Sequence, residues 1–189
     1  MTNYWQTEKI RLRAPENHDL ERYISKKADP NSVRQLLYDI IEPPASEADI
    51  RKNFENALTE FGKGDKRIFI IETLAGEYAG EICIWFTDLR NRVFKYGIFL
   101  EDNFRGQHIG HDALVIVLDY YFNELGYNKA SPTVYEFNKA SAKFHEKFGF
   151  KHEGCLRGEV YTRGQYFDMH CYGMLKTEFN ALYKHFVTL

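Results

Sequence analysis

The chain has 189 residues, of which 44% are hydrophobic and 28% charged, a composition typical of a globular protein with a single domain spanning residues 1–189. Its formal net charge of −2 argues against a nucleic-acid partner or an anionic membrane surface, because both usually require clustered Lys and Arg. No apolar run reaches the roughly 20 residues that span a bilayer and the first residues do not resemble a signal peptide, so we expect a cytoplasmic protein.

The first third of the chain alternates between strand and helix patterns. Ile10–Arg13 alternates apolar and basic residues, which predicts a strand with one buried face. Asn17 or Asp19 is expected to cap the helix that follows, and residues 33–41 form another candidate helix. Ser46 then begins a helix whose apolar residues recur at three- and four-residue intervals.

Three strands come next, predicted at residues 67–73, 81–88 and 93–100 and separated by short turns. Such an antiparallel meander indicates an α+β protein rather than a Rossmann fold. A helix from Gly110, a strand at residues 130–135 and a helix capped by Asn138 follow. A hairpin of residues 155–161 and 167–175 and a short helix complete the chain. We therefore predict one mixed, mostly antiparallel sheet with flanking helices.

Cysteine and histidine give no sign of a metal site. Cys83, Cys155 and Cys171 are widely separated and lack C-x-x-C spacing, and no His residues follow an H-E-x-x-H pattern. We therefore predict structural thiols and no metal ion.

The stretch Arg105-Gly106-Gln107-His108-Ile109-Gly110 joins a predicted strand to a predicted helix. A glycine-containing turn at such a junction presents unpaired backbone N–H groups and the positive end of a helix dipole at one point. This arrangement suits a phosphate or pyrophosphate group.

A second stretch, from Asn138 to Phe150, follows the next predicted strand and contains a predicted helix. Together they resemble the GNAT N-acetyltransferases, most closely the branch of the ribosomal-protein N-terminal acetyltransferases and spermidine acetyltransferase. The resemblance extends from Ile10 to about Leu175. It implies the GNAT fold, with a sheet of about seven strands that splays into a V-shaped opening for acetyl-CoA.

The resemblance also implies which residues bind acetyl-CoA. The pyrophosphate would lie against Arg105, Gly106, Gln107, His108, Ile109, Gly110 and His111. Backbone groups of Phe99 and Leu100 would pair with the pantetheine arm, as an added strand would. A backbone N–H near Leu100 would polarise the thioester carbonyl, while Asn138 would hydrogen-bond the pantetheine arm with help from Ser141.

The chain departs from the family pattern at His108, where the middle glycine of the first motif usually lies. Because backbone N–H groups hold most of the pyrophosphate, we expect a His to be tolerated if its φ is not strongly positive. Its side chain could also add a hydrogen-bond donor.

Catalytic roles are assigned to two residues. The family's general acid, commonly a Tyr, corresponds here to His145, which near its ordinary pKa of about 6.5 could give a proton or a hydrogen bond to the departing sulfur. The family's Glu base corresponds to Lys95, so Glu81 on the neighbouring strand is our substitute base. Asp88 and Glu159 remain alternatives.

Two functions are consistent with these residues. The first is an acetyl-CoA-dependent N-acetyltransferase in which a primary amine attacks directly within a ternary complex. The second is a non-catalytic acyl-CoA-binding regulatory module. The acceptor stays open among a protein N-terminus, a polyamine, an amino sugar and an antibiotic. Tyr38, Trp85 and Phe86 would line an acceptor cleft or belong to the core, and a homodimer is common in the resembled branch.

Overall fold

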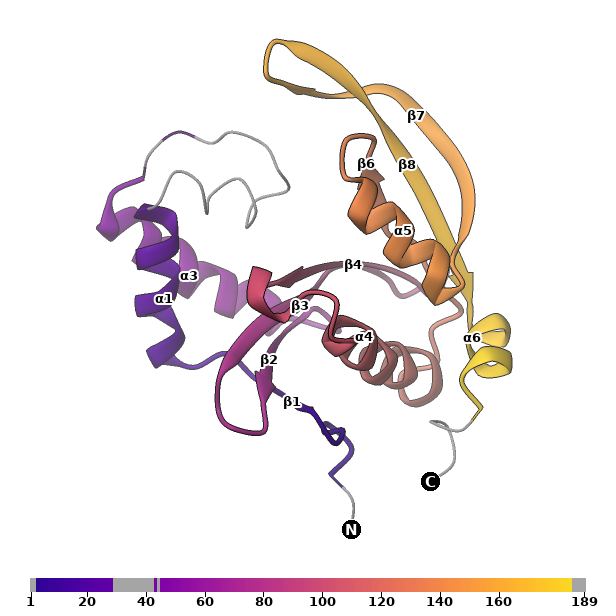
Figure 1. Ribbon diagram of the computed structural model, residues 1–189, viewed down its shortest axis with the longest axis horizontal. Coiled ribbons are helices and arrows are strands. Elements are labelled where there is room, and N and C mark those ends of the chain that lie inside the picture. Colours follow the sequence, from indigo (N-terminus) through magenta and orange to yellow (C-terminus); the bar gives the residue numbers. More distant parts are fainter. Residues whose placement is uncertain (1–2, 29–42, 44, 185–189) are drawn as a thin grey trace.

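A computed structural model describes residues 3–28, 43 and 45–184 of the chain (Figure 1). The helix predicted at residues 33–41, together with Tyr38, lies outside the described residues. Among the described residues, no helix combines the length and the apolar character that a bilayer crossing requires.

The described residues form a mixed sheet of eight strands in the order β1-β2-β3-β4-β5-β8-β6, with β7 paired to β8. The predicted α+β class is confirmed, with one strand more than expected. Among the strand pairs of the described residues, only β4 and β5 run parallel, while the other pairs are antiparallel. The strands are β1 (Ile10–Arg13), β2 (Arg67–Thr73), β3 (Tyr78–Asp88), β4 (Val93–Leu100), β5 (Lys129–Ala130), β6 (Thr133–Tyr135), β7 (Lys151–Thr162) and β8 (Gln165–Leu175).

The additional strand arises because residues 130–135, predicted as one strand, are two. Pro132 lies between β5 and β6 and has no N–H to donate to a neighbouring strand. The parallel pairing of β4 with β5 covers only Val93 and Phe94. Its last hydrogen bond runs from the Ser131 N–H to the Phe94 carbonyl, over 2.8 Å. Beyond this point β4 and β6 separate, which opens the sheet along one line.

The helices begin close to their predicted residues. They are α1 (Asn17–Ala28), α3 (Glu47–Phe61), α4 (Ile109–Asp119), α5 (Lys139–Phe148) and α6 (Lys176–Leu182), with a 3₁₀ turn at Asp102–Phe104 and a π turn at Tyr120–Glu124. Ser46 caps α3 and Asn138 caps α5 through side-chain oxygens, as predicted. The prediction for α1 is wrong in detail, because the helix starts at Asn17 and the Asp19 carboxylate accepts the Glu16 N–H.

The helices cover different faces of the sheet (Figure 1). Tyr23 on α1 contacts Glu81 on one face of β3. Helix α4 packs on the opposite face, where a Cβ placed on Gly110 would lie only 2.9 Å from Leu100 Cδ1. Glycine at position 110 therefore lets α4 approach β4 closely.

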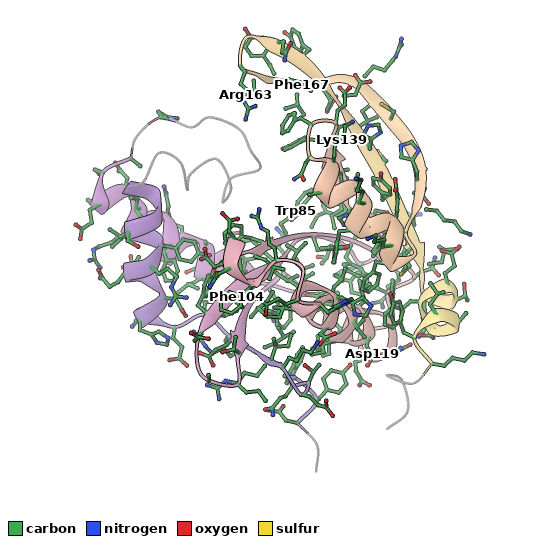
Figure 2. All side chains as sticks on the ribbon, viewed as in Figure 1. Trp85, Phe104, Asp119, Lys139, Arg163 and Phe167 are labelled. Atoms are coloured by element: carbon green, nitrogen blue, oxygen red, sulfur yellow. The ribbon has the colours of Figure 1, made fainter. Side chains whose placement is uncertain are left out.

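Strands β7 and β8 form a long hairpin that extends beyond the other strands (Figure 1). Trp85 on β3 lies between α3 and the hairpin in this view, and Arg163 and Phe167 come from the hairpin (Figure 2). Phe167 contacts Phe137, with ring centroids 4.9 Å apart. This ring contact joins the hairpin to the segment after β6.

Candidate active site

The backbone hydrogen bonds of β4 show which of its residues turn their N–H and C=O groups toward the opening. The Phe94 carbonyl accepts a hydrogen bond from the β5 side, whereas the Glu101 N–H donates to Ala79 on β3. Because neighbouring residues of a strand point their backbone groups to opposite sides, the backbone groups of Ile98 and Leu100 face the opening. The backbone of Phe99 faces β3, where Phe99 pairs with Glu81. The expected backbone pairing of Phe99 with a pantetheine arm is therefore wrong, and Ile98 takes its place.

Two adjoining cavities occupy the opening between β4 and α5. The first has a volume of about 430 Å³ and the second about 410 Å³. Ile98, Phe99, Asn138 and Ser141 line both cavities, so the two cavities adjoin along these residues. The second cavity is further lined by Leu100, Arg105, Gly106, Gly110, Ala140 and Phe144.

The N-terminus of α4 lies at the second cavity, as the anion-binding interpretation requires. Its first N–H groups have no partner within the helix, and the side chain of His108, the residue before the helix, makes no capping hydrogen bond. His108 has φ 66° and ψ 2°, in the left-handed region. The condition under which a His was expected to be tolerated, a φ that is not strongly positive, is therefore not met. Histidine is among the residues better tolerated in this region.

The side chains of the predicted pyrophosphate turn point in several directions. Arg105 Nε donates to the Leu100 carbonyl over 3.1 Å, and its Nη1 lies 2.9 Å from Asp102. Gln107 Nε2 donates to the Asn103 carbonyl over 2.6 Å. Because both side chains bind neighbouring residues, the anion site at this turn rests on backbone N–H groups.

Two other residues of the turn pack their side chains on apolar neighbours, Ile109 completely and His111 in part. Ile109 is buried in the core. The His111 ring packs against Phe148 and Tyr183, with centroids 5.1 and 5.6 Å away. Their contribution to an anion site is therefore limited to their backbone N–H groups.

Asn138 and Ser141 lie where the two cavities meet. The Asn138 side-chain oxygen accepts the Ser141 N–H over 3.0 Å, which starts α5. One residue therefore caps the helix and borders both cavities, so the capping role and the predicted binding role are compatible.

His145 is buried on α5 and lines the first cavity. Its Nδ1 lies 2.8 Å from the Ser141 carbonyl and must donate to it. Nε2 is therefore the acceptor nitrogen, and it is buried without a hydrogen-bond partner among the described residues. Burial lowers the pKa of His145 to about 4, although the hydrogen bond to Ser141 opposes this shift.

These properties correct the predicted acid role of His145. The expected pKa near 6.5 is wrong, because aromatic rings of Tyr96, Phe144, Phe150 and Tyr172 surround the imidazole and disfavour its charged form. At neutral pH, Nε2 carries no proton that it could give to a sulfur atom.

Glu81 lines the first cavity from β3. It accepts a hydrogen bond from the Tyr23 hydroxyl of α1, and the Tyr78 hydroxyl lies 3.4 Å from the same oxygen. Burial, followed by the Glu81 charge, raises the pKa of both tyrosines, so both remain proton donors at neutral pH. The alternative bases lie elsewhere: Asp88 binds the turn after β3, and Glu159 is exposed on β7.

Three further residues of the first cavity had no assigned chemical role. Cys83 and Lys95 line it, and Met169 contributes from β8. Burial, together with the Glu81 charge, raises the pKa of the Cys83 thiol to about 12. Alternation from Glu81 to Cys83 along β3 was the sequence signal that could have placed this thiol beside the carboxylate.

The comparison with known families identifies this arrangement. The sequence profile of the acetyltransferase (GNAT) domain matches residues 9–151. The chain therefore belongs to the GNAT acetyltransferase family, and it is an N-acetyltransferase by family with acetyl-CoA as cosubstrate.

Individual relatives agree with this assignment. The chain is 33% identical over 176 residues to the SPbeta prophage-derived uncharacterized N-acetyltransferase YokL of Bacillus subtilis (strain 168), covering 93% of this chain and 95% of the relative. The fold is similar to that of spermidine N-acetyltransferase from Vibrio cholerae in complex with CoA and spermine, with a TM-score of 0.77, 21% identity and coverage of 92% and 99%. It is also similar to RimL, the ribosomal L7/L12 alpha-N-protein acetyltransferase in complex with CoA, with a TM-score of 0.78, 20% identity and coverage of 89% and 95%.

Proposed function

We propose that this chain transfers an acetyl group from acetyl-CoA to a primary amine by direct attack within a ternary complex. The observation that supports this most strongly is the pair of adjoining cavities between β4 and α5, with a helix N-terminus at the second and His145 at the first. The pyrophosphate would bind at the N-terminus of α4, and the pantetheine arm would pair with backbone groups of Ile98 and Leu100. Asn138 and Ser141 would contact the arm where the cavities meet.

In the chemical step, the amine nitrogen attacks the thioester carbonyl carbon and the carbonyl electrons move to oxygen. The Ile98 N–H faces the opening and would stabilise this oxyanion. Collapse of the oxyanion then breaks the carbon–sulfur bond. The nitrogen loses one proton and the departing thiolate gains one, so the products are an N-acetyl amine and CoA.

We infer that His145 relays this proton. After the attack the nitrogen is positively charged and acidic. Nε2 of His145 can accept a proton from this nitrogen and then give it to the thiolate. A pKa of about 4 makes protonated His145 a ready donor to the thiolate but a weak acceptor, so the relay requires the strongly acidic nitrogen of the tetrahedral intermediate as its proton source. In this proposal His145 is neutral in the resting enzyme, whereas the sequence-based hypothesis had it act as a general acid.

Glu81 is our proposed general base for the incoming ammonium group. Its carboxylate lines the cavity on the side of α1, and the two tyrosine hydroxyls that contact it would orient it. An α-amino group with a pKa near 8 needs little help from a base, whereas an amine with a pKa near 10 needs more.

The high pKa of the Cys83 thiol argues against an acyl-enzyme mechanism. This cysteine lines the first cavity, but a pKa of about 12 leaves almost no thiolate at neutral pH. The acceptor therefore attacks acetyl-CoA itself. The three unpaired cysteines fit a reducing compartment such as the cytoplasm, where we place the enzyme. A homodimer stays a prediction.

An amine panel with acetyl-CoA, monitored by free thiol release, tests the proposal. We expect amine-dependent thiol release and an N-acetyl product. CoA binding without turnover of any amine would instead support the non-catalytic acyl-CoA-binding module, and absence of CoA binding would refute both functions.

A further inference from the structure

The floor of the first cavity carries one acidic and one basic side chain. It is formed by one face of β3, with Glu81, Cys83 and Trp85, and by the matching face of β4, with Lys95 and Phe99. Most of the remaining lining is apolar or aromatic, and His145 is neutral at pH 7. The two charges therefore dominate the electrostatics of this cavity.

Glu81 and Lys95 lie toward opposite ends of this floor. Glu81 pairs with Phe99 across the two strands, and Lys95 is four residues from Phe99 along β4. At about 3.3 Å per residue, the backbone positions of the two charged residues are separated by roughly 13 Å. An acceptor spanning the cavity would meet the carboxylate at one end and the ammonium group at the other.

Lys95 is half-buried and has no acidic partner among the described residues. Its Nζ lies 5.7 Å from the Trp85 ring centroid and 5.8 Å from that of Phe86. Aromatic rings hold the ammonium group in place without neutralising it. The charge of Lys95 thus stays available to an anion in the cavity.

At the Glu81 end of the floor, a cation, Arg22, lies on the other side of Tyr78. The Arg22 guanidinium stacks 4.0 Å over the ring of Tyr78, whose hydroxyl approaches Glu81. Arg22 Nη1 is buried without a hydrogen-bond partner among the described residues. The positive potential of Arg22 reduces the attraction of Glu81 for any second cationic group on the acceptor.

We propose that the acceptor is a primary amine that also carries an anionic group, a carboxylate or phosphate, which Lys95 recognises. This inference rests on the proposed function and adds the substrate class. The amine approaches the thioester near Glu81 and His145, while the anionic group reaches toward Lys95 between the aromatic rings. A polyamine places a second cation against Lys95 and is a poor substrate, since like charges brought together in a partly buried site repel.

Matched acceptors test the inference in the intact protein. One series consists of alkylamines of equal length that end in a carboxylate, a methyl group or a second amine. A peptide series carries Asp, Asn or Lys after the same N-terminal residue and shows whether the anion can come from a peptide. We expect kcat/KM for the carboxylate-bearing acceptor to exceed that for the diamine at least tenfold in one of the series.

Substitution of Lys95 then separates recognition from chemistry. Lys95→Gln should raise KM for the anionic acceptor about tenfold with little change in kcat, and Lys95→Glu should reverse the preference toward the diamine. The matched control is Lys143→Glu, because Lys143 is exposed on α5 and lines neither cavity. Equal thermal stability and CoA affinity of the three variants and the wild type would show that all of them still fold.

The outcomes distinguish this inference from the proposed function. Efficient acetylation of diamines by the wild type, or an anionic preference that survives in Lys95→Glu, would overturn the inference while leaving the acetyltransferase intact. If no amine in either series were acetylated although CoA bound, the proposed function would fail and the inference with it.

Discussion

The buried imidazole of His145 should make the protein less stable as the pH falls from about 6.5 to about 4. The pKa of His145 is about 4 in the folded protein and about 6.5 in an unfolded chain. Between these values the unfolded state binds a proton that the folded state excludes, so the contribution of His145 is complete above pH 6.5 and is lost as the pH falls. The difference corresponds to roughly 3 kcal/mol.

The assay is urea unfolding at about pH 7.5, 6.5 and 5 for the wild type and for His145→Phe, which cannot titrate. A phenyl ring suits this site, because aromatic side chains already surround it. Carboxylates titrate in both proteins, so the difference between the two pH profiles isolates His145. By pH 5 the wild type should have lost roughly 2 kcal/mol relative to the variant. Parallel profiles would show that the imidazole is not held neutral by burial.

Four further substitutions test the site. His108→Gly should leave CoA affinity unchanged or improved and raise stability by up to about 1 kcal/mol, because it removes a side chain from a left-handed residue; a large loss of affinity in calorimetry would mean that the imidazole itself contacts the cosubstrate. Gly110→Val should lower the free energy of unfolding by about 1–3 kcal/mol and weaken CoA binding, because the added side chain moves α4 away from Leu100. Unchanged stability in chemical unfolding would contradict the close packing. Cys83→Ala should retain kcat, whereas abolished turnover with normal CoA binding would indicate an acyl-enzyme. Glu81→Gln should lower kcat/KM about 10²-fold or more for amines with a pKa near 10, and by a smaller factor for α-amino groups. An equal effect on both kinds of amine would argue against Glu81 as the general base.

Local sequence patterns were sufficient to predict most of the fold. Apolar periodicity and the capping residues Ser46 and Asn138 located the long helices, because these signals depend only on near neighbours in the chain. The division of residues 130–135 by Pro132 was also visible in the sequence, since proline cannot donate to a sheet. A prediction of one strand over residues 130–135 ignores this signal and therefore lacks the eighth strand.

The site was less predictable because it depends on contacts between distant segments. The motif resemblance selected His145, but its tautomer and low pKa follow from the Ser141 carbonyl and from rings on β4, on β8 and at the residue before β7. The backbone direction of Phe99 required the register of β4 against β3. Likewise, the placement of Glu81 and Lys95 toward opposite ends of one cavity floor follows from strand pairing and not from spacing along the chain.

Direct transfer within a ternary complex is tested most directly by intact-mass spectrometry combined with thiol release. The protein is incubated with acetyl-CoA alone and then with an amine that carries a carboxylate. We predict that the protein mass stays unchanged in both incubations, with thiol and N-acetyl amine appearing in equal amounts only after the amine is added. Thiol release without amine, together with a gain of one acetyl group by the protein, would contradict this mechanism.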